Sequence, residues 1–171
     1  RQVNFELYRL PLADFLKLSP QSYRGFQAGY QWDQYTPQTG DRLGQWQQTV
    51  DPAAFENYVY KVDVSQAVTG GQPLPPGLYY LEASVDPADF YPEAQGSDPT
   101  AAIDRQILIV SKRSLAVKQG RGDILTWLTD LQSGQPVANA PVRFARPDGP
   151  QNQAVTDAEG VATFTYQVTP D

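Results

Sequence analysis

The sequence contains short runs in which apolar and polar residues alternate, and these runs end at glycine or proline. The clearest run covers residues 3–10, where Val3, Phe5 and Leu7 share one side and the residues between them share the other. A period of two over this length is typical of a half-buried strand. No stretch sustains the period of a helix, so we expect an all-β, antiparallel fold.

Similar runs recur along most of the chain and predict further strands. They cover residues 58–64, 78–85, 105–110, 115–118, 124–130, 141–145, 153–156 and 161–166. The exception is the stretch 11–57, which is rich in Gln and Tyr and has no clear period. Within it, residues 12–16 fit either a helical turn or a strand, and the remainder suggests a long decorated loop or a hairpin.

The polar joint Lys112-Arg113-Ser114 separates two groups of predicted strands. We therefore predict an Ig-like or macroglobulin-like β-sandwich domain over residues 1–112 and a second such sandwich over residues 113–171. The second group has five predicted strands with turns roughly 8–12 residues apart, whereas a full sandwich of this type needs about seven. We expect the second domain to be incomplete, and the chain to be a piece of a longer protein.

Composition excludes several classes of function. The net charge is −6, and the strongest basic cluster is Lys112-Arg113, so we expect no nucleic-acid partner. With Cys 0 and His 0, the chain has no thiol nucleophile, no disulfide and neither of the commonest transition-metal ligands. No apolar run approaches the roughly 20 residues that span a bilayer. We expect no enzyme activity, no catalytic, cofactor-binding or metal site, no cofactor and no transmembrane segment.

Two turn motifs indicate consecutive hairpins. The first is G-Q-P-V-A-N-A-P-V over residues 134–142, and the second is T-D-A-E-G-V-A-T-F over residues 156–164. Asp157 can accept a backbone hydrogen bond in an Asx-turn, and Gly160 can adopt the left-handed conformation. We expect both motifs to be structural.

In their order along the chain, several motifs resemble consecutive macroglobulin domains of the bacterial alpha-2-macroglobulin family. The motifs are P-P-G-L-Y-Y-L-E-A, I-L-I-V-S-K-R-S-L-A-V-K-Q-G and I-L-T-W-L-T-D-L-Q-S-G-Q-P-V-A-N-A-P-V. The resemblance covers about residues 74–166 and is poor over residues 11–57. The residues that match the family's pattern are Lys118, Trp127, Thr129, Asp130, Gly134, Pro136, Val137 and Ala140.

This resemblance implies a framework segment of a large protease-trapping inhibitor. We expect that inhibitor to be extracytoplasmic, in the periplasm or at the cell surface, and either secreted or held by a lipid anchor. Its partners would be neighbouring macroglobulin domains of the same polypeptide, and proteases would be the targets of the full-length protein. In the family a bait region is cleaved, and some members carry a Cys-x-x-Gln thioester. This chain has Cys 0 and no recognisable bait, so we expect it to act as framework.

The alternative function is an Ig-like cell-surface adhesin or a carbohydrate-binding module. Arg121-Gly122-Asp123 matches an integrin-binding tripeptide but also fits an ordinary hairpin tip. An acidic stretch could bind Ca²⁺ or form a solvated loop, and a set of aromatics could stack on sugars or fill a core. The acidic residues are Asp86, Asp89, Glu93, Asp98 and Asp104, and the aromatics are Tyr23, Phe26, Tyr30, Trp32, Tyr35 and Trp46.

Two chemical readings have weaker support. The carboxylates of Asp86 and Glu93 could be proposed as a glycosidase pair, and Lys118 could supply the amine of an isopeptide bond. No surrounding pocket motif supports the first reading, and no Asn in a closing strand supports the second.

Trp127 is predicted to cover the core of the second domain, as the central-strand Trp of an immunoglobulin domain does. In that arrangement Leu125, Trp127 and Thr129 share the buried face, and Ile124 and Leu128 lie on the other. The alternative is an exposed Trp127 that packs against a neighbouring domain.

Overall fold

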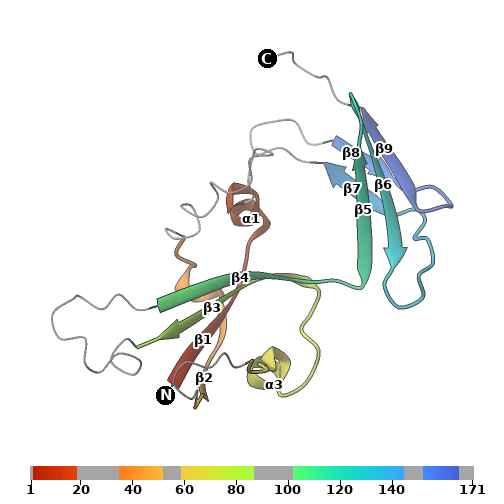
Figure 1. The fold of residues 1–171 in the computed structure, drawn as a ribbon. Coiled ribbons are helices and arrows are strands. Elements are labelled where there is room, and N and C mark those ends of the chain that lie inside the picture. Colours follow the sequence, from red (N-terminus) through yellow and green to blue (C-terminus); the bar gives the residue numbers. More distant parts are fainter. Residues whose placement is uncertain (1, 19–34, 52–58, 87–101, 145–151, 166–171) are drawn as a thin grey trace. The chain divides into compact units, whose positions relative to one another are not determined.

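The computed structural model describes residues 2–18, 35–51, 59–86, 102–144 and 152–165 (Figure 1). The chain divides into two compact units, Arg1–Val110 and Ser111–Asp171. The described residues form antiparallel sheets with a few short helices, which confirms the expected all-β, antiparallel class. Among these residues, no sheet combines strands from both units.

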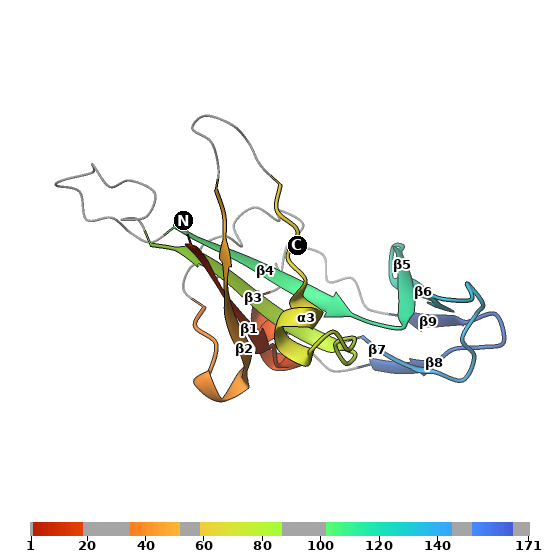
Figure 2. The same ribbon diagram turned by 90° about the horizontal axis from the view of Figure 1, so that it is seen from below.

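The first unit is built on one four-stranded sheet in the order β2-β1-β3-β4 (Figures 1 and 2). Its strands are β1 (Gln2–Arg9), β2 (Arg42–Thr49), β3 (Gly77–Val85) and β4 (Ala102–Val110). All neighbours are antiparallel, and the two inner strands pair with Leu7 opposite Leu81. The predicted alternation in residues 3–10 and 78–85 is therefore confirmed as the two-sided pattern of central strands.

Short helices cover this sheet on both faces, where a sandwich would have a second sheet. Helix α1 (Leu12–Leu18) covers the face of the sheet that carries Tyr80. The buried core between this helix and the sheet consists of Leu10, Leu18 and Tyr80. Helix α3 (Val64–Thr69) lies against β2 on the opposite face. A second sheet is not found among the described residues of this unit.

The strand predicted over residues 58–64 is wrong. Val59 to Asp63 belong to no strand, and α3 begins at Val64 (Tyr58 lies outside the described residues). The Asp63 side chain accepts a hydrogen bond from Gln66 N at 2.9 Å, and Gly70 ends the helix at φ 65°. This N-cap and this left-handed C-cap favour a helix over a strand.

The stretch 11–57 contains more order than its sequence indicated. Its first part is α1, so the helical alternative for residues 12–16 is the observed one. A later part is β2, which pairs with β1 from Gln2 to Tyr8. The rings of Phe5 and Trp46 stack across this pair with centroids 5.3 Å apart. Residues 19–34 and 52–58 lie outside the described part of the chain.

The second unit is a small two-sheet sandwich. One sheet has the order β5-β6-β9, and the other pairs β7 with β8. Ile124, Val142, Ala162 and Phe164 come from both sheets and form one buried core. All five strands predicted in this half of the chain are present: β5 (Arg113–Gln119), β6 (Asp123–Asp130), β7 (Pro141–Phe144), β8 (Asn152–Val155) and β9 (Val161–Thr165).

The core side of β5 is uncovered in the described structure. Leu115 and Val117 lie opposite the buried residues Leu128 and Thr126, so they belong to the same face of the sheet. They are nevertheless 46% and 60% exposed. The core of the smaller sheet packs against β6 and β9, and this leaves the apolar side chains of β5 open.

Helix α3 approaches β2 so closely that a side chain at Gly44 would collide with it. A Cβ atom there would lie 2.9 Å from Val68 Cγ2. We predict that Gly44→Ala displaces α3 and lowers the free energy of unfolding by about 1–3 kcal/mol, as overpacking does. Urea unfolding followed by circular dichroism measures this loss.

Gly40→Ala is the matched control, because a Cβ atom at Gly40 would meet nothing within 4 Å. We expect this variant to stay within about 0.5 kcal/mol of the parent, as surface changes usually do. Equal effects of the two substitutions would contradict close packing of α3 on β2.

Candidate functional site

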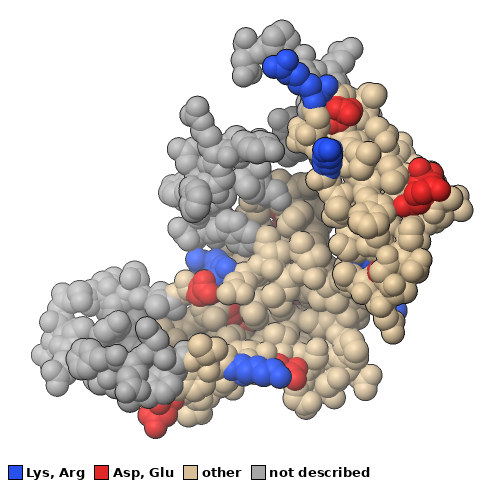
Figure 3. All heavy atoms as spheres, turned by 45° about the vertical axis from the view of Figure 1, so that its right-hand side comes forward, with Lys and Arg blue, Asp and Glu red and all other residues tan. Residues whose placement is uncertain are grey.

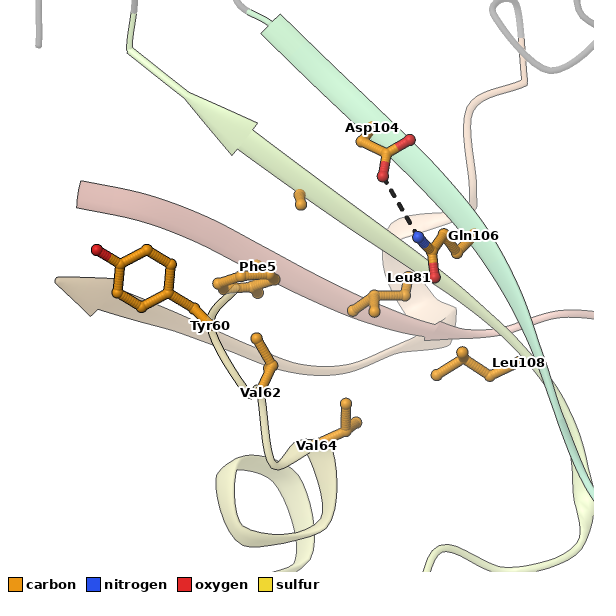
Figure 4. A pocket seen from close by; sticks show the side chains of 9 residues that line it. Phe5, Tyr60, Val62, Val64, Leu81, Asp104, Gln106 and Leu108 are labelled. Carbon is orange, nitrogen blue, oxygen red and sulfur yellow. Dashed lines mark hydrogen bonds between the residues drawn. The ribbon is translucent and has the colours of Figure 1, made fainter. Parts of the chain in front are cut away.

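The first unit has an open groove of about 380 Å³ on the face of the sheet that also carries α3 (Figure 4). Its floor consists of alternate side chains of β1, β3 and β4, and one wall is the extended segment that leads into α3. The lining residues are Phe5, Tyr60, Val62, Val64, Leu81, Ala83, Asp104, Gln106 and Leu108.

The wall of the groove explains the alternation that was mistaken for a strand. Tyr60, Val62 and Val64 all point toward the sheet in Figure 4, while Val59 is fully exposed. The segment is extended and has a period of two, but it lies over the face of the sheet and pairs with none of the described strands. The alternation of apolar and polar residues therefore identified the side of this segment that faces the sheet. It did not show that the segment pairs with a neighbouring strand.

The groove is apolar along β1 and β3 and polar at one end of β4. Gln106 donates a hydrogen bond from Nε2 to Asp104 Oδ2 at 3.4 Å, and both side chains are exposed. Leu108 continues the same side of β4 beside Leu81 and Val64. The arrangement can accept apolar side chains in its middle and a cationic or donor group near Asp104.

The opposite face of the sheet carries a compact polar row. Glu6 and Glu82 lie directly opposite each other on β1 and β3, which would be unfavourable for two unpaired carboxylates. Arg42 lies 3.7 Å from Glu6, and Arg105 lies 3.4 Å from Glu82. Each carboxylate thus has its own cation.

Two tyrosines complete this row as hydrogen-bond donors. Tyr8 donates to Glu6, and Tyr80 donates to Glu82 at 2.8 Å. Burial, with help from the Glu6 hydrogen bond and charge, raises the pKa of Tyr8 to about 12. Burial also raises the pKa of Tyr80, and Glu82 adds to the shift. Both phenols remain neutral donors at neutral pH, which suits a structural network better than nucleophilic chemistry.

In the second unit, Thr156 joins the two turn motifs. Its buried hydroxyl accepts a hydrogen bond from Ala140 N at 2.9 Å and donates to Val137 O at 2.7 Å. The backbone of Thr156 makes two further hydrogen bonds, with Ala140 and Asn139. The loop of the first motif is therefore fixed to the strand end that begins the second.

The second motif forms the turn that its sequence predicts. Asp157 Oδ1 accepts hydrogen bonds from Glu159 N and Val161 N at 3.1 and 2.8 Å, and Gly160 has φ 75°. A Cβ atom at Gly160 would lie 2.5 Å from Leu128 O, so this position has no room for a side chain. The Asx-turn and the glycine requirement are confirmed.

The turn after β6 is fixed by Asp130. Its Oδ1 accepts hydrogen bonds from Gln132 N, Ser133 N and Ser133 Oγ at 3.0, 2.9 and 3.0 Å. Hydrogen bonds from Ser133 lower the pKa of Asp130, because they stabilise the carboxylate form. Gly134 follows at φ 70°, in the left-handed region that favours glycine.

Comparison with solved structures shows a likeness that covers both units. No protein-family model matches the chain, and no curated protein matches it. The crystal structure of native alpha-2-macroglobulin from Escherichia coli spanning domains NIE-MG1 matches with a TM-score of 0.65 and 14% identity, over 97% of this chain and 74% of that one. The chain has the fold of this segment of alpha-2-macroglobulin.

A longer solved segment of the same protein, spanning domains MG0-NIE-MG1, gives a similar result. Its TM-score is 0.60 at 14% identity, over 97% of this chain and 48% of that one. The likeness to alpha-2-macroglobulin inferred from the motifs over residues 74–166 is therefore confirmed as a likeness of fold. It also extends over the N-terminal stretch, where the sequence resemblance was poor.

The tripeptide and the described aromatics that were considered as binding sites of this macroglobulin-like chain lie in a turn or pack against other side chains. Gly122, at φ 89°, lies in the turn between β5 and β6, so Arg121-Gly122-Asp123 is a hairpin tip. Tyr35 packs against Tyr80, and Trp46 stacks on Phe5. The other four aromatics proposed to stack on sugars, Tyr23, Phe26, Tyr30 and Trp32, lie outside the described residues.

The acidic and basic clusters form no site in the described structure. Asp104 is exposed on β4 and Asp86 is exposed just after β3, while Asp89, Glu93 and Asp98 lie outside the described residues. No group of three potential metal ligands occurs among the residues that the structure describes. On the face shown in Figure 3, basic and acidic side chains of the described residues are interspersed. No helix in the described part is long and apolar enough to cross a membrane.

The prediction that Trp127 covers the core is wrong. Trp127 is 46% exposed and donates from Nε1 to Glu159 O at 3.0 Å. The buried side of β6 carries Ile124, Thr126 and Leu128. The predicted alternation is correct, but the smaller sheet covers the side that faces Ala162 and Phe164.

Two substitutions on opposite sides of β6 test this assignment. We predict that Ile124→Ala lowers the free energy of unfolding of the second unit by about 2–5 kcal/mol, because it leaves a cavity in the core. Trp127→Ala should cost about 1–2 kcal/mol, since it removes one hydrogen bond and a half-buried ring. Urea unfolding of both variants compares the two losses, and a larger loss for Trp127→Ala would contradict the assignment.

Proposed function

We propose that this chain is a framework segment of a bacterial alpha-2-macroglobulin-like protease inhibitor. The observation that carries the proposal is the likeness in fold to the NIE-MG1 segment, which extends over 97% of the chain and both of its units. The described polar networks support a structural role. The ion pairs of Glu6 with Arg42 and of Glu82 with Arg105 each join neighbouring strands, and Thr156 joins two turn motifs.

We propose that residues 1–112 and 113–171 are two successive domains, in the order in which NIE and MG1 are named in the E. coli protein. The two units differ in architecture, which supports two distinct kinds of domain. The first is one sheet with helices on its faces, and the second is a small sandwich. The polar joint Lys112-Arg113-Ser114 lies at the change from β4 to β5.

We further propose that the second domain is completed by strands outside this sequence. Leu115 and Val117 support this, because they lie on the core side of β5 and are uncovered. The chain also covers 74% of the NIE-MG1 structure, so that segment includes material without a counterpart here. Added strands facing β5 would bury these two side chains as the smaller sheet buries Ile124.

In this proposal the full-length protein is extracytoplasmic and takes proteases as its targets. Neighbouring macroglobulin domains of the same polypeptide are the direct partners of this segment. The segment itself contributes no catalytic group, since its role is to position other domains. A thioester would have to lie elsewhere, because the chain has Cys 0.

The isolated chain provides the test. We predict that stoichiometric amounts of it leave the activity of serine and metallo-endopeptidases on a protein substrate unchanged, because framework domains alone cannot enclose a protease. The chain should also show no hydrolysis of peptide or glycoside substrates. A stoichiometric inhibitor of each protease serves as the positive control. Inhibition by the intact, undegraded chain would refute the framework role.

A further inference from the structure

The outer edge of β4 is open in the described structure. β4 ends the four-stranded sheet, and its only partner among the described strands is β3. Over its nine residues, A-I-D-R-Q-I-L-I-V, the strand has no proline or lysine, and its two charged residues are Asp104 and Arg105. Arg105 pairs with Glu82 on β3, so Asp104 is the exposed charge on this strand. Proline and charged residues, lysine above all, are the usual features that keep edge strands from pairing with other chains.

Several side chains of β4 are exposed to solvent. Ile109, on the side facing α1, is 65% exposed, and Asp104 and Gln106, on the groove side, are exposed as well. A strand added here would continue the sheet and place its alternate side chains beside Asp104, Gln106 and Leu108. These three residues also line the groove, so long side chains of the added strand can reach its apolar floor.

Charge distinguishes between the possible occupants of this edge. On the groove side β4 offers Asp104, Gln106, Leu108 and Val110, none of which is cationic. If a second copy of β4 paired with this edge and kept its groove-side residues on the groove side, it would therefore place no Lys or Arg beside Asp104. An extended segment with apolar residues at alternate positions and one Lys or Arg complements both the groove and Asp104.

We propose that the outer edge of β4 and the adjoining groove bind an extended, basic peptide segment of a partner protein as a fifth strand. The backbone of the segment pairs with β4, its alternate apolar side chains lie at the groove beside Leu108 and Gln106, and its basic side chain lies at Asp104. The site belongs to the first unit alone, so it does not depend on the proposed role in a protease inhibitor.

The probe is a fluorescent peptide, acetyl-Val-Thr-Val-Thr-Lys-Thr-amide, titrated with the full chain and followed by anisotropy. Run antiparallel to β4, it places its two Val residues beside Leu108 and Gln106 and its Lys beside Asp104. We expect saturable binding, and we expect hydrogen exchange of the outward backbone amides in residues 102–110 to slow when the peptide is added.

Two controls separate backbone pairing from simple apolar adhesion. One peptide is N-methylated at the Val and Lys amides, and the other at the Thr amides. Only one edge of a bound strand faces β4, so we expect one of these peptides to lose binding and the other to keep it. Equal binding by both would overturn the proposal.

Charge reversal tests the position of the basic residue. Asp104→Lys should weaken binding by roughly five- to tenfold, and replacing the peptide Lys by Glu should restore it. Glu159→Lys is the matched control in the second unit and should leave binding unchanged. Three results would each overturn the proposal. The first is no peptide binding at a millimolar concentration of the chain, and the second is slower hydrogen exchange only outside residues 102–110. The third is a chain that, without peptide, has twice its monomer mass and slow exchange in β4.

Discussion

The first unit depends on the burial of two consecutive residues on opposite faces of one sheet. Tyr79 and Tyr80 are adjacent on β3, and both are fully buried. A strand can bury neighbouring side chains only when both of its faces are covered. The hydroxyl of Tyr79 donates to Pro75 O, and that of Tyr80 donates to Glu82. Cover on both sides therefore has to satisfy polar groups as well as exclude water.

This requirement explains the remaining elements of the unit. On one face, α1 brings Leu18 against Tyr80, and Tyr35 meets the same ring edge-on at 5.3 Å. On the other face, α3 covers β2, and the segment 59–63 leads to it across the sheet. The groove is the part of this second face that α3 does not cover. The second unit satisfies a simpler condition, because its sheets bury only their inner sides.

The sequence predicted the second unit well because its signals are local. Each of its strands is bounded by turn residues whose roles are visible in the motif, as with Asp157 and Gly160. The first unit was harder because its elements depend on distant partners. β2, with the sequence R-L-G-Q-W-Q-Q-T, has glutamines where apolar residues would mark a strand, and its partner β1 lies about 40 residues away. The groove arises from three strands and a crossing segment, so no single stretch of sequence could show it.

The orientation of Trp127 is a second feature that the sequence alone could not predict. Period two establishes that Trp127 and Ile124 face opposite ways, but the buried side is decided by the position of β7 and β8. The large aromatic residue was a poor guide, whereas Ala162 and Phe164 on β9 identify the core side through their pairing with β6.

The proposed framework role of these 171 residues is tested most directly by protease challenge of the full-length inhibitor proposed above. The full-length protein would be treated with a limiting amount of endopeptidase, and the first cleavage site would be located by mass spectrometry. If the segment is framework, the first cut lies outside residues 1–171, and the protease then loses activity on large protein substrates. A first cut inside this segment that itself triggers inhibition would contradict the account, because the segment would then be the bait.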